Sequence, residues 1–180
     1  MKTNHILPFL LFIIVLASCK KDDPVIPNEE ELITTLIYTL TPDGGGNSVV
    51  LKFVDLDGDG GNPPIITSDP LASTTSYTGT VELLNELVSP PGNITEEVIE
   101  EGEAHQLFYN VSDTGLQIGF NDSDINGDPI GVETTVLTQQ ASVGTLTIVL
   151  RHFPKKPNDG TAEDAGGETD IQVTFDMIVQ

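Results

Sequence analysis

The chain has 180 residues, of which 28 are acidic and seven are basic, and its formal net charge at neutral pH is −21. A chain this acidic repels phosphate backbones, which excludes nucleic acid as a partner. It contains one cysteine, so an internal disulfide is also excluded.

The first 18 residues have the features of a secretory signal peptide. Lys2 precedes a nearly continuous apolar run over residues 6–17, which is too short to span a bilayer, and small residues follow. The sequence Leu-Ala-Ser-Cys that ends at Cys19 resembles the lipobox of bacterial lipoproteins, in which the cysteine is acylated. We therefore expect Cys19 to anchor the mature chain to a membrane. The alternative is an ordinary signal peptide with an incidental cysteine.

Residues 19–31 predict a flexible tether, because they are polar and contain Pro24 and Pro27. A cysteine followed by lysines and paired aspartates resembles the export signals of Bacteroidota surface lipoproteins. This resemblance implies that the protein is attached to the outer membrane and faces outward from the cell. The periplasmic face of that membrane is the alternative.

Residues 32–180 predict a single all-β domain. Apolar residues alternate with polar ones in eight segments, which Gly, Pro, Asn and Asp clusters separate. The segments are 32–40, 49–53, 77–83, 107–111, 116–120, 132–136, 146–150 and 171–177. This pattern is typical of an Ig-like β-sandwich of about eight antiparallel strands. One short acidic helix is expected over residues 93–103, with Thr95 as its N-cap.

The directions of the strands predict where the loops gather. If consecutive strands alternate in direction, the segments 96–103, 121–133 and 152–168 lie at one end of the sandwich. The loop 55–64 then lies at the opposite end.

One of these loops has the spacing of a calcium-binding loop. Oxygen ligands recur at alternate positions, a glycine follows for the sharp turn, and a glutamate completes the pattern. The predicted ligands are Asp122, Asp124, Asn126 and Glu133. Strands flank the loop where an EF-hand has helices, so calcium would bind outside an EF-hand. The alternative is a hairpin loop whose residues only supply turn conformations.

A second acidic loop repeats the first half of this pattern. Its carboxylates are Asp55, Asp57 and Asp59, but the position that would complete the pattern is Ile66, which cannot bind a cation. Three carboxylates this close repel one another unless a cation or turn amides satisfy them. Calcium and a plain turn are both consistent with the sequence.

Two histidines form a further candidate site. His105 and His152 have the same strand parity as their apolar neighbours, so each is expected to point inward at the same end of the sandwich. With Glu103 they would provide two imidazoles and a carboxylate, a set suited to zinc or another transition metal. The alternative is two unrelated histidines, each hydrogen-bonded at the rim of the core.

Several segments behind the lipobox carry a resemblance that covers most of the chain. They are "DLDGDGGNPPI", "ITEEVIEEGEAHQLFY", "LRHFPKK" and "AGGETDIQVTF". The series looks like a family of small Bacteroidota outer-membrane lipoproteins of uncertain function, often labelled as type 1 periplasmic-binding-fold proteins. That label implies two α/β lobes, whereas these residues predict one helix at most and no βαβ spacing. The resemblance also implies partnership with an outer-membrane uptake receptor, and it supplies no catalytic residues.

Three functions stay open at this stage. The first is a lipid-anchored binding or accessory module that calcium stabilises, and the second is a lipoprotein that captures a zinc-type ion. The third is a secreted hydrolase. The chain has no G-x-S-x-G elbow, no phosphate-binding glycine loop and no H-E-x-x-H motif. We therefore expect no enzymatic activity.

Overall fold

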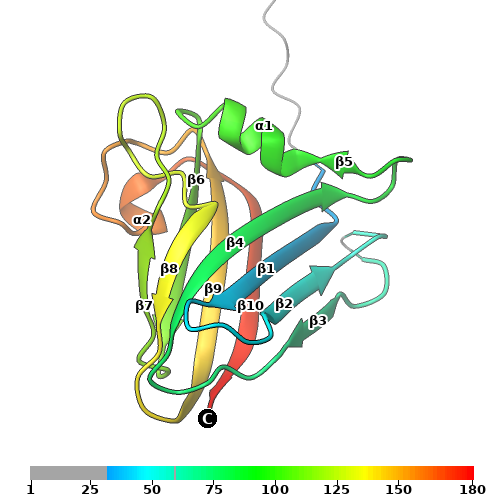
Figure 1. The fold of residues 1–180 in the computed structure, drawn as a ribbon. Helices are drawn as coiled ribbons and strands as arrows, with labels where there is room; N and C mark the ends of the chain where they lie inside the picture. Colours follow the sequence, from blue (N-terminus) through cyan, green and yellow to red (C-terminus); the bar gives the residue numbers. More distant parts are fainter. Residues whose placement is uncertain (1–31, 59) are drawn as a thin grey trace, which may run out of the picture.

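The computed structural model describes residues 32–58 and 60–180. The predicted signal peptide, the tether, Cys19 and Asp59 lie outside the described residues. Within them, two antiparallel β-sheets pack face to face, which confirms the predicted all-β sandwich (Figure 1). None of the helices in this part of the chain has the length and apolar character needed to cross a membrane.

The larger sheet has the strand order β3-β2-β1-β4-β8-β7, and β5 pairs with β4. Its strands are β1 (Thr35–Pro42), β2 (Val49–Val54), β3 (Ile65–Ser68), β4 (Ser76–Asn85), β5 (Gly92–Asn93), β7 (Gln117–Phe120) and β8 (Glu133–Leu137). The smaller sheet has the order β10-β9-β6. It consists of β6 (His105–Ser112), β9 (Ser142–His152) and β10 (Glu168–Val179). The helices of the described residues are α1 (Ile94–Glu100) and α2 (Ala162–Ala165).

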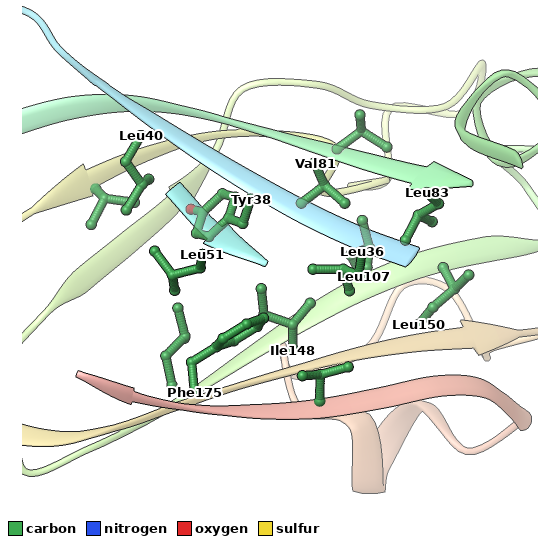
Figure 2. Packing of buried hydrophobic residues seen from close by; sticks show 14 of the residues in the cluster. Leu36, Tyr38, Leu40, Leu51, Val81, Leu83, Leu107, Ile148, Leu150 and Phe175 are labelled. Atoms are coloured by element: carbon green, nitrogen blue, oxygen red, sulfur yellow. The ribbon is translucent and has the colours of Figure 1, made fainter. Parts of the chain in front are cut away.

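The core lies between the sheets, because alternate side chains of each strand point inward. Leu36 and Tyr38 of β1 face Ile148 and Leu150 of β9 and Phe175 of β10, and all five are fully buried (Figure 2). Burying such a side chain stabilises the fold by about 1.5–3 kcal/mol. A register slip of one residue would expose a whole strand's apolar set, so this core fixes which side chains face inward.

The strand count placed the loop 55–64 at the wrong end of the sandwich. The short strand β3, which the alternation missed, makes β1 and β4 run antiparallel, with Thr35 beside Leu84. This arrangement brings the loop after β2 to the end of the sandwich where β4 leads into α1 (Figure 1). We call this end the α1 end. The β7–β8 and β9–β10 loops also lie there, as predicted.

The helix α1 is shorter than predicted, and its N-cap is different. Asn93 occupies the N-cap position without a side-chain hydrogen bond. The Thr95 hydroxyl instead accepts a hydrogen bond from Leu83 N and donates one to Leu83 O, which ties the helix to β4. After Glu100 the chain continues in turns as far as residue 104, rather than as an extended strand.

The β9–β10 segment folds over the outer face of the smaller sheet. Phe108 and Val149 point outward from that sheet and are buried beneath Ala162 and Ala165 of α2. This second small core holds the segment after His152 against the sheet. It therefore positions the residues that surround the histidine at the end of β9.

Candidate metal centre

His105 begins β6 and His152 ends β9, and the two residues are direct cross-strand partners. Their exposed fractions are 0% and 2%. The ring centroids lie 4.4 Å apart, and the ring planes are tilted by 30°. The structure thus brings the two imidazoles together at the α1 end, where strand parity predicted them.

The carboxylate that lies with the two histidines is that of Glu101, not Glu103. One ligand atom each from Glu101, His105 and His152 can be chosen so that all three lie within 4.8 Å of one another. Glu103 Oε1 instead accepts a hydrogen bond of 2.7 Å from Asn126 Nδ2. The turns after α1 are the physical reason. They place Glu101 one helical turn before His105, and Glu101 O lies 3.2 Å from His105 Nδ1.

Asp170 is a further charged group at this site, which the sequence analysis missed. It is the extra residue where β10 shifts register against β9, between Thr169 and Ile171. Such a bulge redirects a side chain, and the Asp170 side chain is only 1% exposed. Its Oδ1 lies 3.7 Å from His152 Nδ1. A carboxylate beside one ring nitrogen is the usual arrangement that orients a metal-binding histidine.

His152 Nδ1 is an unusual atom in this core. It is buried, and within the described residues it makes no hydrogen bond, because the contact with Asp170 is too long for one. Buried polar atoms are nearly always hydrogen-bonded, since leaving one unsatisfied costs free energy. Within the described residues, this nitrogen therefore has the Asp170 carboxylate as a charged neighbour but no hydrogen bond.

The predicted calcium ligand Asp122 interacts with the backbone of its own loop. Its Oδ1 accepts a hydrogen bond of 2.8 Å from Gly131 N. Its Oδ2 accepts bonds of 2.8 Å from Val132 N and 3.0 Å from Glu133 N. Both oxygens thus stabilise the approach to β8, while the Glu133 residue is exposed.

The next predicted calcium ligand, Asp124, binds a lysine. Lys156 Nζ donates hydrogen bonds to Asp124 Oδ2 at 3.1 Å, to Gly102 O at 2.6 Å and to Pro129 O at 2.9 Å. The Lys156 and Asp124 side chains are 7% and 1% exposed. An ammonium group surrounded by three oxygens therefore occupies the interior of this loop cluster. The sequence analysis did not identify Lys156.

The carboxylates of the second acidic loop accept hydrogen bonds from the turn itself. Asp55 Oδ1 accepts from the backbone N–H groups of Asp57 and Gly58, at 3.3 Å and 2.9 Å. Asp57 Oδ2 accepts from the backbone and side-chain nitrogens of Asn62, at 2.9 Å and 2.7 Å. The bonds from Asn62 lower the pKa of Asp57 below its ordinary value. These contacts are those of a well-formed acidic turn.

The donors at the histidine pair fit a transition metal better than calcium. Zinc takes imidazole and carboxylate ligands and often binds three protein groups with a fourth position left for another ligand. Calcium prefers oxygen ligands throughout. Zinc bonds of about 2 Å require ligand atoms closer than about 4 Å, so side-chain rotations must bring the more distant donors together.

Comparisons with known proteins give no match: no protein family, no curated protein and no solved structure matches this chain. The assignment of the site therefore rests on its geometry and chemistry. The resemblance to small outer-membrane lipoproteins, and the receptor partnership that it implies, stay predictions.

Proposed function

We propose that this protein is a lipid-anchored β-sandwich that captures a transition-metal ion, of the zinc type, at its α1 end. His105 and His152 supply the two imidazoles, and Glu101 supplies the carboxylate. The convergence of these three groups within 4.8 Å carries the proposal. The Asp170 carboxylate lies 3.7 Å from His152 Nδ1 and adds a negative charge beside that ring.

A purely structural role accounts less well for the two histidines. Paired imidazoles inside a sandwich bury polar nitrogens that an apolar cross-strand pair would not bury. The unsatisfied Nδ1 of His152 adds to that cost. Because a bound ion offsets this cost through coordination, metal binding gives a reason for placing polar rings in the core.

The proposal keeps the membrane attachment through Cys19 and a location on the outer membrane. A captured ion would there be close to an outer-membrane uptake receptor, the partner that the resemblance implies. No nucleic acid and no catalytic step form part of the proposal.

Zinc titration of the whole chain, purified in detergent, tests the proposal. We expect one bound ion per chain and a comparable loss of affinity in His105→Ala and His152→Ala. Glu101→Gln should weaken binding by about tenfold or more, since even residues that only orient metal ligands contribute that much. Glu103→Gln is the matched control and should leave the affinity unchanged. Lack of zinc binding by the wild type, or equal losses in the two glutamate variants, would refute the site.

A further inference from the structure

Phe153 directly follows His152 and has a backbone conformation that residues with bulky side chains rarely adopt. Its φ angle is +50°, in the left-handed region. A bulky side chain there is a genuine outlier. Strain of this sort persists only where the surrounding structure enforces it, and it clusters at binding and active sites.

Two contacts hold Phe153 in this conformation. Its backbone N–H donates a hydrogen bond of 2.7 Å to Ala104 O, in the turn that precedes His105. On the other side, Gly167 packs so closely that a β-carbon there would clash with the carbonyl oxygens of His152 and Phe153. The strained backbone is therefore fixed by both neighbouring segments.

This conformation places the Phe153 ring against His152. The ring centroids lie 4.2 Å apart, the planes differ by 27°, and Phe153 is 58% exposed. The tilted ring of His105 also contacts His152, at 4.4 Å and 30°. Two rings this close and this nearly parallel cannot share one face of an imidazole, so His152 lies in the middle of a three-ring stack. Phe153 is the ring of that stack that meets solvent.

An ion can be coordinated by both histidines only if this stack rearranges. The lone pair of an imidazole nitrogen lies in the plane of the ring, so stacked rings must turn before both lone pairs point at one ion. His152 cannot turn without sliding across Phe153. Stacked aromatic rings attract each other beyond the effect of their buried area, so this contact opposes the rotation.

We propose that Phe153 controls how fast a transition-metal ion enters and leaves the site formed by His105 and His152, an inference that rests on the proposed metal binding. The Phe153 ring covers His152 and keeps water from it. Because the Phe153 ring lies 4.2 Å from His152, it also stands in the path of the turning imidazole, and this steric obstruction slows loading and release together. The protein thereby retains a captured ion against external chelators.

Cobalt(II) is the probe for this inference, because its visible absorption reports its coordination directly. Stopped-flow mixing of the whole chain with cobalt, and of the loaded chain with excess chelator, gives both rates. Phe153→Ala should speed each rate about tenfold, which corresponds to about 1.4 kcal/mol in the barrier, with a smaller change in Kd. Phe153→Gly should speed both rates as Phe153→Ala does. Because glycine accommodates the positive φ angle, this variant keeps the test valid if the alanine variant folds poorly.

Ile125→Ala is the matched control, because Ile125 is an apolar side chain of the β7–β8 loop that is 89% exposed. Faster exchange in both Phe153 variants but not in Ile125→Ala would support the inference. Cobalt binding with unchanged rates in both Phe153 variants would overturn the role of Phe153 and leave the metal site standing. A wild-type chain that binds neither cobalt nor zinc would overturn the proposed function, and this inference with it.

Discussion

Lys156 Nζ lies 3.1 Å from Asp124 Oδ2 beneath the loops of the α1 end, and both side chains are almost fully buried. Two backbone carbonyl groups also accept hydrogen bonds from this ammonium group. The contacts join the turn after α1, the β7–β8 loop and the β9–β10 loop. Lys156 therefore provides a positive charge beside Asp124 from within the chain. The sequence analysis had predicted Asp124 as a ligand of a calcium ion.

Removing this ammonium group should destabilise the fold. Lys156→Met leaves the buried Asp124 carboxylate without its counter-charge, and we expect a loss of about 3 kcal/mol in the free energy of unfolding. Lys155→Met is the matched control, because the Lys155–Asp164 pair is exposed and such pairs contribute about 0–1 kcal/mol. Urea unfolding of both variants measures the difference. Equal losses would contradict a structural role for Lys156.

Asp124 should also make stability depend on pH in the acidic range. Burial raises its pKa, but the hydrogen bond from Lys156, those from the backbone of Asp128 and Asn126, and the lysine charge together lower it below its ordinary value. Because the folded state holds the ionised form, this contribution is complete above the unfolded pKa of about 3.9. It is lost as the pH falls through the lower folded value.

Chemical denaturation of the wild type and Asp124→Asn between pH 6 and pH 2 measures this effect. The stability difference between them should be largest above pH 4 and should shrink at lower pH. Asp69→Asn, which removes an exposed carboxyl group, is the control for general acid effects. A difference that is constant across this range would rule out the contribution of Asp124.

Calcium should stabilise a Lys156→Ala variant more than the wild type. The substitution leaves Asp124 Oδ2 and the carbonyl oxygens of Gly102 and Pro129 without the ammonium group, and calcium prefers oxygen ligands of these kinds. An ion that binds the folded state raises the Tm by mass action. Thermal unfolding with millimolar calcium and with chelator measures the shift. An equal shift in both proteins would place any bound calcium elsewhere, with the acidic turn around Asp57 as the next location to test.

Strand parity located the histidine pair, because the alternation of side chains follows directly from extended backbone geometry. It failed where the backbone is not regularly extended. Turns after α1 place Glu101 beside His105, and a bulge turns Asp170 inward. The strand β3 shows no alternating burial, so no period-two signal marked it.

The contact between Lys156 and Asp124 illustrates a second limit of the sequence. The two residues are 32 positions apart, and neither lies on a strand. Local patterns predict which face of a strand a residue occupies, but they do not predict which loops meet. The acidic loop therefore had the composition of a calcium site, although its oxygens interact with the backbone and with a lysine.

Replacing Cys19 by Ser should release the protein from membranes. Cys19 lies outside the described residues, so this prediction rests on the lipobox sequence that ends at this residue. Detergent-phase partitioning of the wild type and Cys19→Ser measures the change. The conservative variant Ser18→Ala keeps the lipobox cysteine and should stay in the detergent phase. Retention of Cys19→Ser in that phase would contradict lipid anchoring.

Gly167→Ala should damage both the fold and the metal site. Gly167 has a φ angle of +76°, and a β-carbon at this position would clash with His152 O and lie 2.9 Å from Phe153 O. Gly160→Ala is the matched control, because Gly160 has a φ angle of +90° in the same connection but has open space around it. Both variants should lose about 1–2 kcal/mol from the positive φ angle alone.

The clash adds a further loss to Gly167→Ala, because the carbonyl group of His152 must move away from the new methyl group. Since this shift displaces the imidazole that shares the site with His105, zinc affinity should fall in Gly167→Ala and stay unchanged in Gly160→Ala. Urea unfolding and zinc titration of the two variants measure both effects. If the two alanine variants lose the same stability and keep the same zinc affinity, the close packing of Gly167 does not position His152.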